Sequence, residues 1–305
     1  IVIYDDASTD RTLAKIETLA EGNRTITVLE GKQNRGPGGG KNYAAQFADT
    51  DYFMFVDADD YIEEDYLQVM ADAIEKRPVD ELLPDIVISN FKGVDEKGNV
   101  RYIRSFKGND VALYSGITNW GKLFRRCFWE EHHLKIPEGK VLDDVLLRAY
   151  IVGCGPEVKH ISATSGYCYT HSPHSVSNTY MNHFIDGVAV QEMNYLFDQK
   201  VYVDSERIEE YLYWVYKVYC WHMLKSGSGV GYKDMKKEYH IMHELLCGLF
   251  PEYIDNPYLY GKRSLKSERK IVKVAVRGMF LMEKIRMQKL FLYVYSLVNL
   301  RWLWP

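Results

Sequence analysis

Three carboxylates crowd into four positions at the end of a short apolar run, in Phe55-Val56-Asp57-Ala58-Asp59-Asp60. Because side chains alternate along an extended chain, Asp57 and Asp59 are expected to project to the same side, while Asp60 begins a turn. A divalent cation with oxygen ligands relieves such crowding, so we predict a metal site at Asp57 and Asp59. The alternative is a polar turn in which Asp59 or Asp60 caps a helix predicted over residues 63–76.

A nucleoside diphosphate needs a cation on its phosphates, a polar pocket for its base and closely approaching backbone. The chain offers residues for each need. Asp5 or Asp6, after the strand-like run Ile1–Tyr4, can accept hydrogen bonds from a base or ribose. The segment 36–40, with four glycines and followed by Lys41, can approach phosphate. Asn42 follows that lysine, so the stretch does not match the P-loop sequence.

The elements that must position these residues alternate between strand and helix. The predicted strands are Ile1–Tyr4, Thr25–Glu30 and Phe53–Asp57. Between them we expect a helix to about Ala20, capped by Ser8, Thr9 or Asp10, and a glycine-rich loop running into a helix through Phe47. This alternation predicts an α/β fold with a largely parallel sheet, in which ligands bind at the carboxyl ends of the strands.

The chain changes character towards its second half. We predict a fourth strand over residues 85–91, a turn at 95–99, a short helix after Trp120–Arg126, a helix ending near Gly153 and a last strand over 167–171. From about Met181 the pattern becomes long and helical, rich in Tyr, Met and Trp. We therefore place a boundary near residue 180, which divides the chain into a catalytic domain, 1–180, and a helical region, 181–305.

Composition narrows the class of protein. The chain is 47% apolar and 26% charged over 305 residues, which is ordinary for a globular protein. Its five cysteines show neither a CxxC spacing nor a Cys/His ligand pattern, which favours reduced thiols in the cytoplasm and argues against a zinc site.

The charge is distributed unevenly. The last 44 residues carry a net charge of +9, whereas residues 1–261 carry −13. This asymmetry suggests a basic amphipathic tail that meets an anionic membrane surface, placing the protein at the inner face of the plasma membrane. The longest charge-free run there, 290–300, is too short to span a bilayer. The alternative is a helix packed on the domain with a solvated basic face. Nucleic-acid binding is not expected, because the rest of the chain is acidic.

Five motifs together resemble the family 2 glycosyltransferases with the GT-A fold, in particular bacterial transferases of capsule, exopolysaccharide and teichoic acid synthesis. They are Asp5-Asp6-Ala7-Ser8-Thr9-Asp10, Asn34-Arg35-Gly36 to Lys41-Asn42, Phe55 to Asp60, Trp120 to Phe124, and Pro137-Glu138-Gly139 through Asp143-Asp144-Val145. The resemblance covers about residues 1–178. In the family, a strand and helix whose loop helps to hold the base would precede Ile1, and we expect this unit to be absent here.

The resemblance implies a role for each matching residue. Asp5, Asp6, Asn34, Gly36, Lys41 and Asp57 would bind the nucleotide, Asp57 and Asp59 would hold Mn²⁺ or Mg²⁺, and Asp144 would be the catalytic base. The implied reaction is inverting transfer of a sugar from a nucleotide donor, UDP-linked, to a hydroxyl of a glycan or lipid-linked acceptor. A carboxylate would take the proton of that hydroxyl. Without the resemblance, Asp143 and Asp144 would be interpreted as a helix N-cap.

Three features depart from the family pattern. The acidic pair is Asp143-Asp144 where Glu-Asp is usual, so either carboxylate could be the base. Lys41 stands where an Arg is common, and His171 follows the late Tyr-rich strand where relatives often have Arg. His171 could ligate the metal or lie in a plain surface loop. The competing interpretations are a sugar nucleotidyltransferase and a non-catalytic nucleotide-binding fragment or interaction module.

Overall fold

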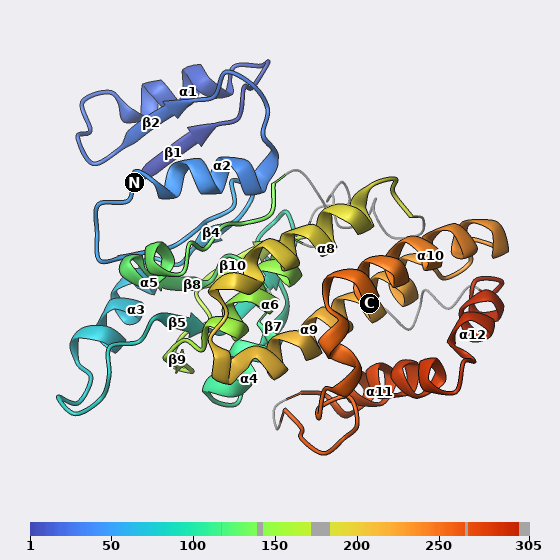
Figure 1. Ribbon diagram of the computed structural model, residues 1–305. Coiled ribbons are helices and arrows are strands. Elements are labelled where there is room, and N and C mark those ends of the chain that lie inside the picture. Colours follow the sequence, from blue (N-terminus) through green and yellow to red (C-terminus); the bar gives the residue numbers. More distant parts are fainter. Residues whose placement is uncertain (117, 139–142, 172–183, 266–267, 299–305) are drawn as a thin grey trace.

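The computed structural model describes residues 1–116, 118–138, 143–171, 184–265 and 268–298. Strands and helices alternate in the first part of the chain, and helices alone make up the described residues beyond 184. Figure 1 shows β1 and β2 at the upper left, α10 to α12 on the right, and α8 and α9 across the middle. The predicted fold class, an α/β part followed by a helical region, is confirmed.

The first strand-helix units form a small layer of their own. Strands β1 (Val2–Asp5) and β2 (Thr27–Glu30) pair in parallel as a two-stranded sheet, with helix α1 (Thr12–Ala20) between them in sequence. The residue at the N-cap position of α1 is Arg11 and not Ser8, Thr9 or Asp10, although the Asp10 carboxylate accepts a bond from the Thr12 amide nitrogen at 2.9 Å. Helix α1 ends at Ala20, as predicted.

The expected glycine-rich loop is itself helical. Helix α2 spans Gly36–Ala45, so the glycines form its first turns instead of leading into it. Close packing explains their use, because a Cβ at Gly38 would lie 2.4 Å from the Pro137 carbonyl oxygen and one at Gly40 would lie 2.9 Å from the Tyr4 ring. The glycines therefore let α2 approach protein neighbours, and the approach of residues 36–40 to a phosphate stays a prediction.

A second sheet, of order β3-β8-β5-β9, forms the centre of this part. Its strands are β3 (Tyr52–Phe53), β8 (Lys122–Arg125), β5 (Ile86–Ser89) and β9 (Val158–Ile161). Only β5 and β9 pair in parallel, whereas β8 runs antiparallel to both of its neighbours. The expected largely parallel sheet is wrong in this respect. The predicted strand 53–57 also ends early, although Phe55 still bridges to Trp120.

A third sheet has the order β4-β10-β6-β7. Its strands are β4 (Tyr61–Ile62), β10 (Tyr167–Thr170), β6 (Phe91–Val94) and β7 (Val100–Arg104). The single strand expected over 85–91 is thus two strands in different sheets, divided at Asn90. The buried Asn90 side chain accepts a bond from the Phe106 amide nitrogen at 2.9 Å and donates to the Ser162 carbonyl oxygen at 3.3 Å, which holds the chain where it changes sheets.

Helices cover these sheets and build the second part. The remaining helices are α3 (Tyr66–Glu75), α4 (Asn109–Ser115), α5 (Arg126–Glu131), α6 (Asp143–Cys154), α8 (Val188–Gln199), α9 (Ile208–Trp221), α10 (Tyr232–Leu249), α11 (Lys270–Lys284) and α12 (Gln288–Tyr295). Single-turn helices lie at Lys200–Tyr202, Ser205–Arg207 and Pro251–Asp255, and a π-helix at His222–Ser226. No helix of the described residues is long and apolar enough to cross a bilayer.

One hydrophobic cluster joins the two parts of the chain. It includes Phe55 and Tyr150 on one side of the predicted boundary and Trp214 and Tyr219 on the other. All residues of α6 from Val145 to Cys154 are buried, and α6 contacts both α8 and α9. The boundary near residue 180 itself falls outside the described residues, and the division into 1–180 and 181–305 stays a prediction.

A buried charge cluster ties three helical segments together. His222, at the start of the π-helix, has Nδ1 2.9 Å from Glu192 of α8 and Nε2 2.7 Å from Glu238 of α10. Burial alone would lower the pKa of His222, but the two carboxylates raise it to about 9. An imidazolium between two buried carboxylates therefore holds α8 and α10 against the end of α9.

Stability is expected to fall between about pH 6.5 and 9 as His222 loses its proton. The raised folded-state pKa means that its contribution is complete below the unfolded value and disappears above the folded one. The full span corresponds to about 3 kcal/mol. Urea unfolding at both pH values would show this fall in the unaltered protein, and His222→Gln should flatten it. An equal fall in the variant would assign the pH dependence to other groups.

Candidate active site

Asp57 and Asp59 converge after β3, as the sequence predicted, and Asp60 joins them, which was not predicted. Oxygen atoms of Asp57, Asp59 and Asp60 all lie within 4.8 Å of one another. Carboxylate oxygens are the ligands that Mg²⁺, Mn²⁺ and Ca²⁺ prefer, so the donor set fits a hard divalent cation. His171 is not part of this group, and its Nε2 lies 3.1 Å from the Tyr102 hydroxyl. Its role as a ligand stays a prediction that the described geometry does not favour.

Asp60 does more than begin a turn, because its carboxylate is held by hydrogen bonds from β10. Its carboxylate accepts bonds from the Tyr167 hydroxyl and the Thr170 amide, both at 2.8 Å, and the Asp57 amide donates to the same hydroxyl at 3.2 Å. Burial raises the pKa of Asp60 to about 6. Neither Asp59 nor Asp60 caps the following helix, which begins only at Tyr66 with Asp65 before it. The helix-cap interpretation of this turn is therefore wrong.

Stacked aromatic rings support the acidic turn. Tyr167 stacks on Trp120 with ring centroids 4.5 Å apart, and Tyr169 stacks on Trp120 at 5.2 Å. Trp120 in turn bridges to Phe55, two residues before Asp57. Sequence reasoning missed Tyr167, because the bond to Asp60 joins residues 107 positions apart and no local pattern indicates it.

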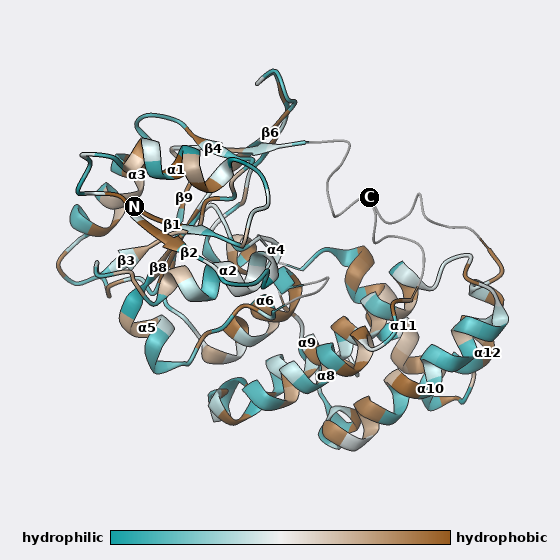
Figure 2. Ribbon diagram, turned by 90° about the horizontal axis from the view of Figure 1, so that it is seen from above, coloured by the Kyte–Doolittle hydropathy of each residue, from teal (hydrophilic) through white to brown (hydrophobic). Residues whose placement is uncertain are grey.

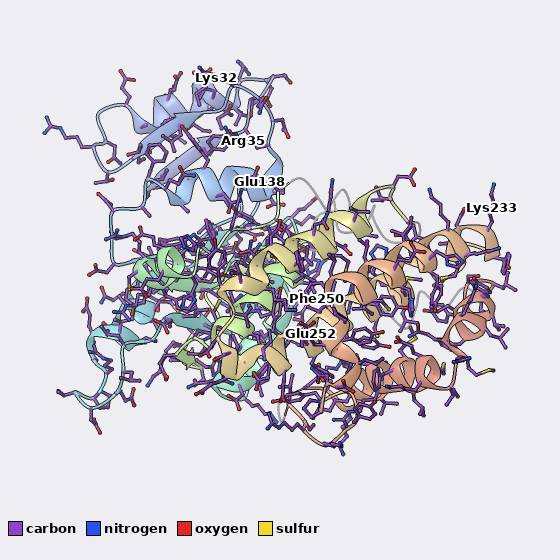
Figure 3. All side chains as sticks on the ribbon, in the orientation of Figure 1. Lys32, Arg35, Glu138, Lys233, Phe250 and Glu252 are labelled. Carbon is purple, nitrogen blue, oxygen red and sulfur yellow. The ribbon has the colours of Figure 1, made fainter. Side chains whose placement is uncertain are left out.

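The residues predicted to bind a nucleotide gather at the end of β1. The Asp6 carboxylate accepts bonds from the backbone amides of Arg35 and Gly36, at 2.7 and 2.8 Å, and the Asn34 side chain bonds both the Asp6 carbonyl oxygen and the Gly36 amide. Gly36 has a φ of +73°, a value that favours glycine. This turn starts α2, beside which Figure 3 labels Arg35 and Glu138.

Asp5 is buried at the same strand end. One carboxylate oxygen accepts a bond from the Ser8 amide at 3.0 Å, while the other has no partner among the described residues. A buried acceptor without a donor is costly, so this oxygen is a natural partner for a ligand N–H or O–H group.

Lys41 connects the two ends of the site. Its ammonium group forms an ion pair with Asp57 instead of standing free for a phosphate. Burial lowers the pKa of Lys41, but the nearby carboxylates Asp57, Asp144 and Asp143 outweigh this and raise it overall. Asp57 and the acidic pair of α6 therefore lie within electrostatic reach of one ammonium group.

The acidic pair opens α6, as expected, with both residues in its first turn. The Asp144 carboxylate accepts a bond from the Asn119 amide at 2.9 Å, from the loop before β8. Burial raises the pKa of Asp143, and burial together with the Asp143 charge raises that of Asp144 to about 7. A carboxyl that titrates near neutrality can both accept and release a proton, which is the property of a general base.

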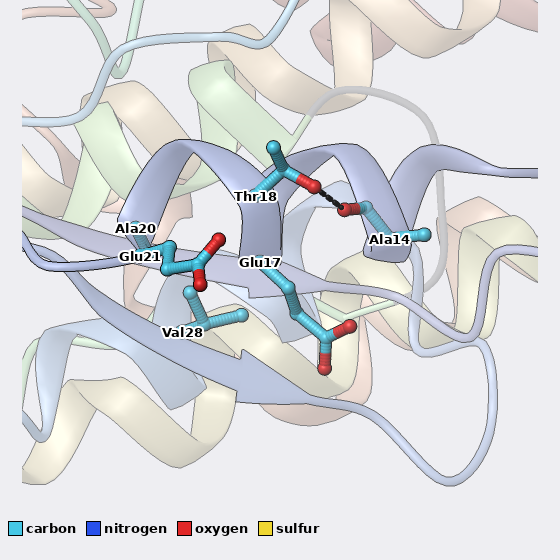
Figure 4. A pocket seen from close by; sticks show the side chains of 6 residues that line it. All are labelled: Ala14, Glu17, Thr18, Ala20, Glu21 and Val28. Atoms are coloured by element: carbon cyan, nitrogen blue, oxygen red, sulfur yellow. Dashed lines mark hydrogen bonds between the residues drawn. The ribbon is translucent and has the colours of Figure 1, made fainter.

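The surface pocket shown in Figure 4 lies apart from the predicted site residues. It has a volume of about 550 Å³ and is lined by residues of α1, by Glu21 directly after it and by Val28 of β2; those of α1 are Ala14, Glu17, Thr18 and Ala20. The bond from the Thr18 hydroxyl to the Ala14 carbonyl oxygen, 2.9 Å, stays within α1. None of the predicted site residues lines this pocket.

The fold is that of a GT-A-like domain, with the acidic turn at Asp57 to Asp60 and the acidic pair of α6 within electrostatic reach of Lys41. A crystal structure of Staphylococcus aureus TarS 1-349 in complex with UDP-GlcNAc has the same fold, with a TM-score of 0.64 at 16% identity, covering 94% of this chain and 82% of that one. Residues 1–129 match the model of Glycosyl transferase family 2. This part of the chain is similar in sequence to that family.

TarS is also similar to this chain in sequence, as is a second bacterial protein. The poly(ribitol-phosphate) beta-N-acetylglucosaminyltransferase TarS of Staphylococcus aureus (strain Mu50) is 29% identical over 159 residues, which is 50% of this chain and 27% of that protein. The succinoglycan biosynthesis protein ExoO of Rhizobium meliloti is 26% identical over 215 residues, 64% of this chain and 59% of that protein. The chain thus matches about a quarter of TarS and three fifths of ExoO.

Proposed function

We propose that this protein is an inverting, metal-dependent glycosyltransferase that moves a sugar from a UDP-sugar to a hydroxyl of a cell-surface polysaccharide or lipid-linked acceptor. The observation that carries the proposal is the junction at Lys41, whose ammonium group pairs with Asp57 of the acidic turn and lies within electrostatic reach of the acidic pair of α6. The solved TarS complex with UDP-GlcNAc supports UDP as the nucleotide.

Each group has a distinct task in this proposal. Asp57 and Asp59, with Asp60 beside them, would hold Mn²⁺ or Mg²⁺, which neutralises the diphosphate as it leaves. Asp6, Asn34 and Gly36 shape the turn at the nucleotide end, and the unpartnered oxygen of Asp5 accepts a bond from the base or ribose. Asp144 takes the proton of the acceptor hydroxyl, which attacks opposite the leaving diphosphate and inverts the anomeric centre.

A screen of nucleotide sugars with Mn²⁺ or Mg²⁺, scored by release of free nucleoside diphosphate, tests this function. Donor hydrolysis needs no acceptor, so the unidentified acceptor is not required. Release of UDP that stops on adding EDTA is expected. Release of pyrophosphate from a sugar phosphate and UTP would instead show a nucleotidyltransferase. If neither reaction occurs and UDP causes no thermal shift, the protein is a non-catalytic module.

We further propose that the helical part docks on an anionic membrane through α11 and α12. Ile271, Val274, Leu281 and Ile285 are 59 to 71% exposed and follow intervals of three, seven and four residues, so they share one face of a helix. Leu290 and Val294 of α12 are also more than half exposed. Lys270, Lys284, Arg286 and Lys289 lie exposed beside them, and Figure 2 shows hydrophobic and hydrophilic stretches alternating along α12.

An amphipathic surface of this kind binds lipid by burying apolar side chains while its cations meet anionic headgroups. Replacing both Ile271 and Val274 with serine should weaken binding to phosphatidylglycerol-containing vesicles about 10- to 100-fold, measured by co-sedimentation. Val79 and Leu82, 100% and 73% exposed in the loop after α3, supply the matched double-serine control. Binding that is unchanged in the α11 variant, or equal on neutral vesicles, would refute this surface.

A further inference from the structure

Two buried cations lie within electrostatic reach of Asp144 and have no task in the reaction as proposed. Lys122, the first residue of β8, is 1% exposed, and Arg148 of α6 is 2% exposed. The Lys122 ammonium group donates to the Thr118 hydroxyl at 3.0 Å and to the carbonyl oxygens of Thr118 and Trp120. Nη2 of Arg148 donates to the Gly116 carbonyl oxygen, whereas Nε and Nη1 have no acceptor among the described residues.

Both cations are fixed to the same loop and helix as Asp144. Arg148 follows Asp144 by four residues, so the two side chains occupy the same face of α6. Asn119, whose amide holds the Asp144 carboxylate, lies between Thr118 and Trp120, the two residues that hold Lys122. Any movement of this loop therefore moves the carboxylate and the lysine together.

The charges around Asp144 are opposed in sign. Burial lowers the pKa values of Lys122 and Arg148, and Arg148 lowers that of Lys122 further, while Asp144 is the carboxylate that raises both. On the other side, burial, Asp143 and Asp57 raise the pKa of Asp144, and Lys41 and Lys122 lower it. Asp144 thus stands between a second carboxylate that disfavours its charge and cations that favour it.

Packing alone does not account for this arrangement. A buried cation loses several kcal/mol of hydration, and well-packed apolar residues commonly replace buried ion pairs without loss of stability. The two nitrogens of Arg148 that have no acceptor within the described part of the chain add to that cost. A role in the chemistry of the neighbouring carboxylate explains why charged side chains occupy these positions.

We propose that Lys122 and Arg148 are positioning residues that keep Asp144 ionised in its buried place, ready to accept a proton at neutral pH. This inference rests on the proposed function of Asp144. In the step concerned, the acceptor hydroxyl gives its proton to a carboxylate oxygen of Asp144, its oxygen bonds to the anomeric carbon, and the bond to the diphosphate breaks with its electron pair leaving on UDP. The two cations stabilise the state before the proton arrives.

The pH dependence of kcat/KM tests the proposal. Lys122→Met keeps the length of the side chain and removes its charge. The acid limb of the profile should therefore move to higher pH by about one unit. At pH values below the limb kcat/KM should fall about tenfold, and at pH values above the limb it should equal that of the unaltered protein. Arg148→Met should shift the limb the same way, and Arg148→Lys should restore it. Lys225→Met, which removes a lysine of the π-helix, is the control and should leave the limb in place.

Two further outcomes separate the possible failures. An equal loss of activity at every pH, with the limb in place, would show that the cations only maintain the structure. A double-mutant cycle on stability needs no activity at all, because Asp144→Asn should lower the denaturation midpoint less in Lys122→Met than in the unaltered protein. Equal reductions would overturn the inference, whereas absence of transfer in the unaltered protein would overturn the proposed function alone.

Discussion

Replacing Asp144 with asparagine is expected to slow sugar transfer by about 10²- to 10⁴-fold while UDP affinity stays nearly unchanged. Asparagine has the same shape and can still accept the bond from the Asn119 amide, but it cannot take a proton. The unaltered enzyme should gain activity as the pH rises through about 7, since Asp144 must lose its proton before it acts as a base. This dependence should be lost in the variant.

Asp143→Asn is the matched control, because it changes the adjacent carboxylate of the same helical turn. A smaller loss is expected there. A larger loss in Asp143→Asn than in Asp144→Asn would transfer the role of base to Asp143. If both variants retained nearly full activity, neither carboxylate would take part in proton transfer.

Replacing Asp59 with alanine should abolish Mn²⁺-dependent binding of UDP without unfolding the protein. Asp59 is exposed and belongs to the carboxylate group, so the substitution removes a ligand but no core contact. Calorimetric titration with UDP, with and without Mn²⁺, measures the effect, and the thermal midpoint reports on folding. Asp49→Ala, at another exposed aspartate outside the group, should bind as the unaltered protein does. Metal-dependent UDP affinity that persists in Asp59→Ala would remove this residue from the site.

Local patterns in the sequence predicted what local chemistry determines. The crowding of carboxylates indicated that Asp57 and Asp59 would converge, although they lie in a turn and not in a strand, and Asn23, which opens a turn, indicated an end of α1 near Ala20. The orientation of β8 between β3 and β5 was not predictable in this way, since pairing across more than 30 residues depends on the whole core.

The second half of the site shows the same limit. The acidic pair was visible as a helix start, yet its contact with the Asn119 amide joins positions 25 residues apart. The glycines before Lys41 suggested a loop because isolated glycines weaken helices, and tertiary packing against Tyr4 and Pro137 overrode that tendency. The composition of this segment could not reveal which neighbouring residues leave no room for a Cβ at the glycines.

The contact between α2 and residues 136–137 limits how this domain can be recombined with its relatives. The Asn42 amide group donates to the Ile136 carbonyl oxygen at 2.7 Å and accepts from the Ile136 amide at 2.8 Å, an exchange like that between paired strands. Gly38 meets the Pro137 carbonyl oxygen in the same place. A chimera that exchanges only α2, to alter donor preference, would break these hydrogen bonds. Residues 136–137 must therefore be exchanged together with the helix.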